Sequence, residues 1–407
     1  MSRRAIVCLA ITLCLGFNWG TSALAADDIR IGVIYPRSGA GARFGQLCVN
    51  AAEMAAEDIN AAGGIKSMGG AKIKVIVADT QTEPKVAISE TERLINREKL
   101  SAFNGAYYSG HTIPATEISE RAQIPWVTGS VSDPITGRGY KYVFQVSPKA
   151  SHFGAMQVQT LKELDTEFGV KHTKVAIAFE DTAYGTDTAG GIKKECEKLG
   201  YQVVLYEPYK AGFTDADPIV SKLKASGAEI FFPVSYLTDA IMILRTMKKL
   251  DVNAAFIGGG AGYLMPDFYT ALKEDSEYVI SVGSWNHDLP YPAVKDFSAR
   301  FLKKYGEFLP EHAGESYVIM WVIKEALEKA KSADPQKVRD ALASMDVKDG
   351  AAAGMPGGHT KFDATGWNEK VHPVMVQWQK GQLRGIWPKD SQAVKPTWPV
   401  PKWSDRK

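Results

Sequence analysis

The sequence predicts an α/β protein of two Rossmann-like lobes. Two series of short apolar runs alternate with helical segments, which is the pattern of parallel sheets covered by helices. In the second series the runs begin 26, 28 and 26 residues apart, the length of one strand, one helix and two turns. With 407 residues, 45% hydrophobic and 23% charged, the chain is long enough for two hydrophobic cores.

The first series begins with an apolar strand at residues 28–34. A helix follows, because apolar residues recur three and four positions apart, and Gly63-Gly64 ends it. The residues of this stripe are Phe44, Leu47, Cys48, Ala51, Ala52, Ala55 and Ile59. Further strands are predicted at 73–78, 101–104 and 124–127.

The second series has strands predicted at 175–179, 201–207, 229–233 and 255–257. From about 281 to 344 the sequence predicts mostly helix, at 292–305, 312–331 and 335–344. Two more strands are predicted at 371–377 and 382–386. The tail at 395–403 is too rich in proline for a helix or a central strand.

The first 25 residues have the three parts of a secretory signal. Arg3 and Arg4 precede an apolar stretch, and Ala23-Leu24-Ala25 supplies small residues, so we expect cleavage after Ala25. The apolar stretch has about 13 residues, whereas a membrane-spanning helix needs roughly 20. Neither Cys8 nor Cys14 follows a small residue, which disfavours lipidation. We therefore expect a soluble protein exported to the periplasm.

The net charge and the cysteine content exclude several further classes of partner and site. The formal charge is +2, and removing the two arginines of the signal leaves 0, so nothing indicates a nucleic-acid partner. The mature chain keeps Cys48 and Cys196, which we expect to lie in different lobes and to remain unbonded. No Cys/His set has the spacing of a metal site, and we expect no cofactor.

Catalytic motifs are missing from the sequence. It has no Gly-x-Ser-x-Gly elbow, no His-Glu-x-x-His and no Walker-type loop. Residues 258–262 (Gly-Gly-Gly-Ala-Gly) suggest a phosphate loop but lack the third glycine at the required spacing. This favours a binding protein over an enzyme.

Several short segments, in order, resemble the type I periplasmic binding proteins of ABC importers, in the leucine/isoleucine/valine-binding branch. They cover essentially residues 28–380. In the first half they are Ile31-Gly32-Val33, Ser38-Gly39, Phe44-Gly45, Ala55-Ala56-Glu57-Asp58-Ile59-Asn60, Gly63-Gly64-Ile65, Asp79, Gly105-Ala106-Tyr107-Tyr108-Ser109-Gly110, Ile124-Pro125 and Ser130-Val131-Ser132-Asp133-Pro134. In the second half they are Tyr184-Gly185 and Tyr236 after Phe231-Phe232-Pro233.

The resemblance implies two α/β lobes joined by three crossovers, with the ligand in the cleft between them. We place the crossovers near 146–147, 282–285 and 362–371. Lobe 1 would then comprise 26–146 plus 285–362, and lobe 2 would comprise 147–284 plus 363–390. Residues 391–407 would form the proline-rich C-terminal tail. Closure around the ligand would be a hinge motion, and an importer would recognise the closed form.

Two serines point to a carboxylate site in lobe 1. Ser109 and Ser132 each follow a predicted strand and precede a helix start, where backbone N–H groups are free to bind an anion. The resemblance implies that Ser109, Val131 and Ser132 hold the ligand carboxylate, with Ser130 beside them. The alternative is that both serines cap helices.

Aromatic residues are predicted to complete the site. By resemblance, Tyr184 and Tyr236 of lobe 2 cover the ligand, and Phe44 lies on the lip of lobe 1 with Tyr108 in a neighbouring loop. Arg37, Tyr107 and His111 lie in the same loops.

One segment departs from the family. Where amino-acid binders of this branch place an acid for the ammonium group, this sequence has residues 258–262 without a carboxylate. Since a buried ammonium needs a partner, either another acid substitutes or the ligand has no ammonium. The possible substitutes are Asp133, Glu180, Asp181 and Asp239.

We therefore expect a monomeric receptor that delivers a small carboxylate, such as a branched-chain or other hydrophobic amino acid, to the membrane permease of an ABC importer. An aromatic or other organic acid, for which the tyrosines suit a ring face, is the alternative ligand. A ligand sensor or an enzyme on the same fold is the alternative of another class.

Overall fold

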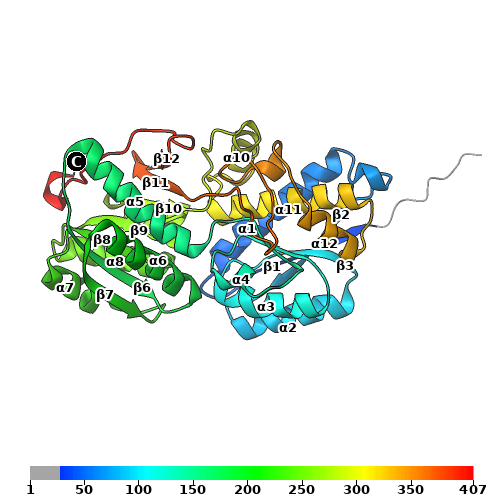
Figure 1. Cartoon of the computed structure of the whole chain (residues 1–407), viewed down its shortest axis with the longest axis horizontal. Helices are drawn as coiled ribbons and strands as arrows, with labels where there is room; N and C mark the ends of the chain where they lie inside the picture. Colours follow the sequence, from blue (N-terminus) through cyan, green and yellow to red (C-terminus); the bar gives the residue numbers. More distant parts are fainter. Residues whose placement is uncertain (1–27, 407) are drawn as a thin grey trace, which may run out of the picture.

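The computed structural model describes residues 28–406 and contains two α/β lobes, each built on its own sheet (Figure 1). The signal sequence predicted at 1–25 lies outside these residues. No helix among the described residues is long and apolar enough to cross a membrane. The two-lobe α/β architecture predicted from the sequence is confirmed.

The sheet of lobe 1 is parallel throughout, in the order β2-β1-β3-β4-β5. Its strands are β1 (Ile29–Tyr35), β2 (Ile73–Asp79), β3 (Leu100–Gly105), β4 (Trp126–Thr128) and β5 (Val143–Gln145). The helices of this lobe's first part are α1 (Ala42–Ala61), α2 (Pro84–Arg97), α3 (Ser109–Arg121) and α4 (Pro134–Gly137). Ile31 and Val33 of β1 pack with α1, whereas Ile34 packs with α2 and α3, so helices cover both faces.

The sheet of lobe 2 has the order β12-β11-β10-β9-β8-β6-β7. It is parallel from β7 to β10, and β11 and β12 add an antiparallel hairpin at one edge. Its strands are β6 (Lys174–Glu180), β7 (Gln202–Tyr209), β8 (Ile230–Val234), β9 (Ala255–Gly258), β10 (Ile280–Gly283), β11 (Val374–Gln379) and β12 (Gln382–Trp387). Its helices are α5 (Ala150–Phe168), α6 (Ala183–Leu199), α7 (Asp217–Ser226), α8 (Leu237–Lys249) and α9 (Pro266–Leu272).

The remaining helices return to lobe 1. They are α10 (Pro292–Tyr305), α11 (Glu311–Ala330) and α12 (Pro335–Ala343), and α11 packs along α1. Arg300 of α10 also contacts Asp58 of α1, with an N–O distance of 2.7 Å. The chain thus passes between the lobes three times, after β5, after β10 and before β11. The residue boundaries of the lobes given above stay a prediction.

Two strands were missed by the sequence patterns. Residues 280–283 form β10, although the sequence predicts mostly helix from about 281 onward. Residues 143–145 form β5 at the edge of the first sheet. Both strands are three or four residues long, so neither is long enough to show an alternating or continuous apolar pattern.

The proline-rich tail packs against lobe 2 without forming a strand. The Trp398 indole is buried and donates to Asp165 of α5 at 3.1 Å, and the Trp403 indole donates to the Val252 carbonyl at 2.9 Å. The two cysteines are buried, unbonded and in different lobes, Cys48 on α1 and Cys196 on α6, as the sequence predicts.

Candidate functional site

The loops that follow β3 and β4 bring Ser109 and Val131 to the face of lobe 1 that meets lobe 2. Ser109 is the first residue of α3, and its hydroxyl accepts from the Ser132 N–H at 3.2 Å rather than capping a helix. Within residues 28–406 the backbone N–H groups of Ser109 and Val131 make no hydrogen bond. Both residues line a cavity between the lobes, so these N–H groups are available to an anion.

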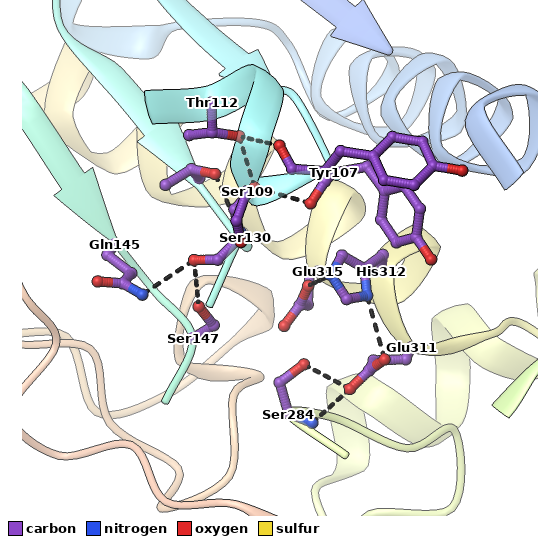
Figure 2. A network of polar contacts seen from close by, with 12 residues as sticks. Tyr107, Ser109, Thr112, Ser130, Gln145, Ser147, Ser284, Glu311, His312 and Glu315 are labelled. Atoms are coloured by element: carbon purple, nitrogen blue, oxygen red, sulfur yellow. Dashed lines mark hydrogen bonds and ion pairs between the residues drawn. The ribbon is translucent and has the colours of Figure 1, made fainter. Parts of the chain in front are cut away.

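The other two serines of the predicted site make contacts of their own. Ser130 donates to the Tyr107 carbonyl at 2.9 Å, and its carbonyl accepts from Gln145 and Ser147 (Figure 2). The Ser132 hydroxyl donates across the lobe boundary to Asp187 of α6. Neither residue lines a described cavity. The Ser130 contacts therefore hold the loop in place, and the Ser132 hydroxyl links the two lobes.

Lobe 2 presents Tyr184 and Tyr236 to these loops. Tyr184 is buried on α6 and donates to the Gly259 carbonyl at 2.7 Å. Tyr236 precedes α8, and its ring centroid lies 5.3 Å from that of Tyr184 and 4.7 Å from that of Tyr108 in lobe 1. The predicted aromatic cover is thus in contact with lobe 1.

The space between the lobes is divided into two cavities. The inner cavity is about 10 Å³, which is room for about one water molecule. Eight residues line it: Tyr107, Ser109, Val131, Phe153, Tyr184, Tyr236, Ala261 and His312. The outer cavity is about 350 Å³ and is lined by Phe44, Tyr108 and His111 from lobe 1 and by Asp239 from lobe 2. Tyr107 and Tyr236 line both.

Tyr107 separates the two cavities through an unusual backbone conformation. Its φ of 77° lies in the left-handed region, which costs a bulky residue about 1–3 kcal/mol. Its ring stacks on Phe44 with centroids 3.9 Å apart and meets His312 edge-on at 4.7 Å. Arg37, which lies on the same lip, is exposed and contacts Gln46.

The glycine-rich segment after β9 leaves no room for an acidic side chain at Gly259 or Gly262. A Cβ atom at Gly262 would lie 2.4 Å from the Leu237 nitrogen, and one at Gly259 would lie 2.9 Å from the Val234 side chain. Gly260 has a φ of 99°, which disfavours any other residue. The glycines therefore let this segment pack closely on β8 and α8.

The four acids proposed as substitutes differ in their surroundings. Asp133 accepts from the Ser151 N–H at 3.0 Å, and Asp181 is exposed. Glu180 is buried and accepts from Thr182 and Gly185 at the start of α6. Asp239 lines the outer cavity, and within residues 28–406 its one hydrogen-bond donor is the Gly212 N–H. Burial raises the pKa of both Glu180 and Asp239.

A buried group of three ionisable residues at the start of α11 was not anticipated (Figure 2). Glu311 accepts from the Ser284 hydroxyl at 2.8 Å and lies 3.1 Å from His312 Nδ1. His312 Nε2 lies 3.7 Å from Glu315, whose two oxygens have no hydrogen-bond partner among the described residues. Burial raises the pKa of Glu315 to about 8. Burial lowers the pKa of His312, but Glu315 and Glu311 raise it more, so it lies above its usual value.

This group was missed because charged residues on a helix usually indicate a solvated face. The sequence does contain an indication of burial. The small residues Ala313, Gly314 and Ser316 lie among the charged ones, and small residues allow a helix to pack closely on its neighbours. A Cβ at Gly314 would lie 2.4 Å from the Trp285 ring. Among residues 28–406 no group of three or more His, Cys, Asp and Glu has the arrangement of a metal site.

Comparison with known proteins identifies the family. Residues 28–382 match the model of the periplasmic binding protein family. The Leu/Ile/Val-binding protein homolog 7 of Brucella suis biovar 1 is 32% identical over 383 residues, which are 92% of this chain and 94% of the relative. The chain therefore belongs to the periplasmic binding proteins, in the Leu/Ile/Val-binding branch that the sequence motifs indicate.

Solved structures agree with the fold. The leucine-binding protein LivK from Thermotoga maritima is similar with a TM-score of 0.78 and 21% identity, covering 88% of this chain and 98% of LivK. A solute-binding protein of an ABC transporter from R. palustris, solved in complex with benzoate, is similar with a TM-score of 0.77 and 17% identity, covering 90% of this chain and 98% of that chain.

Proposed function

We propose that this protein is the periplasmic receptor of an ABC importer and binds a small carboxylate, such as a hydrophobic amino acid, by closing its two lobes. The observation that carries the proposal is the pair of unbonded N–H groups of Ser109 and Val131 at the inner cavity. Such groups bind an anion without a positive side chain. The names of the relatives, which refer to leucine, isoleucine and valine, support an amino-acid ligand.

In this closed arrangement the rings of Tyr107, Tyr184 and Tyr236 fill most of the inner space. A ligand carboxylate therefore enters when the lobes separate or the rings move. Asp187 is then also released from Ser132, so that the Ser132 hydroxyl becomes available to the ligand. The permease would bind the closed form, in which the ligand joins both lobes.

A specific observation supports a second candidate ligand, an aromatic or other organic acid without an ammonium group. The packing of residues 258–262 excludes an acidic side chain at Gly259 or Gly262. In addition, the walls carry the aromatic rings of Phe44, Tyr108 and Tyr236, and the R. palustris neighbour was solved with benzoate.

Calorimetric titration with leucine, phenylalanine, benzoate and 3-phenylpropanoate tests the proposal. We expect at least one of them to bind, and Ser109→Ala to weaken that binding about tenfold or more, because a hydrogen bond to a charged group contributes about 1.5–3 kcal/mol. Ser89→Ala is the matched control, since Ser89 is exposed on α2 of the same lobe and donates within its own helix.

Two results would contradict the proposal. If none of the four acids binds, the ligand is not a small carboxylate of these classes. If Ser109→Ala binds within twofold of the parent, the Ser109 hydroxyl makes no hydrogen bond to the carboxylate, and its role in the proposed site is wrong.

A further inference from the structure

The outer cavity has an unbalanced charge. Two of its lining residues are charged at neutral pH, Arg43 and Asp239. Arg43 already lies against two carboxylates, Asp267 at 3.2 Å and Glu307. Its charge is therefore matched within the protein, which leaves the Asp239 carboxylate as the uncompensated charge of the cavity wall.

Asp239 has capacity for further hydrogen bonds. It is 2% exposed, and its two oxygens share one donor, the Gly212 N–H, at 3.2 and 3.1 Å. A carboxylate can accept about four hydrogen bonds. Asp239 lies in the first turn of α8, where an acid stabilises the helix dipole, but that role does not require a place in a cavity wall.

A second acceptor lies in the wall contributed by lobe 1. His111 is 5% exposed, and its Nδ1 has no hydrogen-bond partner among the described residues. Burial lowers the pKa of His111 to about 4, so the ring is neutral at neutral pH and one of its nitrogens can accept a hydrogen bond. Neither wall of the cavity therefore offers an unpaired cation to a ligand.

The remaining walls suit a cation. The rings of Tyr108 and Tyr236 lie 4.7 Å apart, and with Phe44 they line the same cavity as Asp239. Aromatic faces attract an ammonium group, and the attraction is larger where water is excluded. The negative charge of Asp239 and the aromatic faces of the cavity thus both favour a cationic occupant.

We infer that the outer cavity is a subsite for a cationic nitrogen of the ligand, with Asp239 as its counter-ion and Tyr108 and Tyr236 as its aromatic walls. The inference rests on the proposed carboxylate site at Ser109. The ligand extends from the inner to the outer cavity past Tyr107 and Tyr236, which line both. Its class is a carboxylate with an ammonium group at the far end of the chain, longer than a branched-chain amino acid.

The test uses 5-aminopentanoate and pentanoate, which differ in the distal ammonium alone, with leucine as a third probe. Calorimetry of the parent should show at least tenfold tighter binding of 5-aminopentanoate than of pentanoate. In Asp239→Asn, which keeps the shape of the side chain, the preference should fall to within about twofold. Asp217→Asn is the matched control, because Asp217 lies in the first turn of α7, pairs with Lys249 and lines neither cavity, and it should keep the full preference.

A second variant keeps the test independent of Asp239. A Cβ at Gly110 meets nothing within 4 Å, and Gly110 lines the outer cavity, so Gly110→Trp should obstruct the subsite without disturbing the fold. We expect it to weaken 5-aminopentanoate more than tenfold. Gly190→Trp, on the exposed side of α6 and also with open space, should bind like the parent.

The outcomes separate the two proposals. If pentanoate or leucine binds in a Ser109-dependent manner but 5-aminopentanoate has no advantage, the subsite is wrong and the proposed function stands. If the advantage survives Asp239→Asn or Gly110→Trp, the ammonium binds elsewhere and the inference is again wrong. If none of the three probes binds, both this inference and a carboxylate site open to such chains are contradicted.

Discussion

The inner and outer cavities both have buried acidic side chains near them, but the charges are balanced differently. Beside the inner cavity, Glu311 accepts from Ser284, and His312 lies between Glu311 and Glu315. At the outer cavity, Asp239 accepts from one backbone N–H and has no cationic partner in the described part of the chain. Burying an unmatched charge is costly. The inner acids therefore have an ionisable partner, His312, within the fold, whereas we infer that the outer carboxylate is paired by a ligand.

This difference also separates the roles of the two lobes. In the proposed binding mode, lobe 1 would bind an anion through N–H groups and a hydroxyl, and lobe 2 would bind a cation or an apolar chain through Asp239 and Tyr236. A ligand with a carboxylate at one end and a cationic nitrogen at the other would contact both lobes and would stabilise their association. A simple organic acid would use the lobe 1 contacts and the ring faces alone.

The largest expected effect is that of Tyr236→Ala, because Tyr236 lines both cavities. Truncating a buried aromatic at the centre of an interface typically costs 2 kcal/mol or more, which corresponds to about 30-fold weaker binding. We expect this loss for every ligand that binds the parent, measured by calorimetry. Tyr206→Ala, which removes an exposed ring of the same lobe, should leave affinity unchanged. Loss for one ligand class alone would show that the cavities serve separate ligands.

Much of the fold could be predicted because long buried strands leave a clear pattern. Residues 175–179 and 230–233 are apolar runs of the central strands, and the helix at 292–305 has the predicted bounds. The edge strand β5 and the interior strand β10 were missed, since three or four residues are too few for periodicity. Their existence depends on neighbouring strands that are distant in the sequence.

The candidate site was only partly predictable. Ser109 follows a predicted strand and precedes a helix start, which indicated its place at the end of the sheet, whereas Tyr184 and Tyr236 were placed by the family resemblance. His312 could not, because its burial depends on α11 packing along α1 and placing the imidazole against Phe44 and Tyr107, which are distant in the sequence. Asp239 was one of four candidate acids. Only the tertiary packing distinguishes it from Glu180, whose carboxylate accepts from the Gly185 N–H in the first turn of α6, whereas Asp239 lines the outer cavity.

The inner group predicts a pH-dependent stability. Burial raises the pKa of Glu315 in the folded protein to about 8, above the usual 4.5 of a glutamate, so the folded state holds a proton that the unfolded state has lost between these pH values. The raised pKa of His312 acts in the same direction above pH 6.5. Stability should therefore fall as pH rises from 5 to 9, by up to about 1.4 kcal/mol per pH unit for one proton.

Glu315→Gln tests this prediction, because it keeps the shape of the side chain and removes the titration. Denaturant unfolding of the variant at pH 5 to 9 should show a flatter decline than the parent and a relative gain in stability at pH 9. Glu53→Gln, an exposed acid on α1, should follow the parent. Parallel curves for Glu315→Gln and the parent would show that Glu315 does not hold the proton.

The smallest expected effect concerns the rim of the outer cavity, where Arg43 of α1 lies against Asp267 of α9 in the other lobe. A partly exposed ion pair contributes about 0.2–1 kcal/mol, so Arg43→Gln should raise the ligand's dissociation rate by up to about fivefold at low ionic strength. Because salt screens exposed charges, the difference should disappear at 1 M KCl. Arg121→Gln is the control, since Arg121 pairs with Glu117 within α3 and so does not connect the two lobes. A salt-independent loss, or one above tenfold, would mean that Arg43 binds the ligand itself, and the outer cavity would then hold an anion rather than a cation.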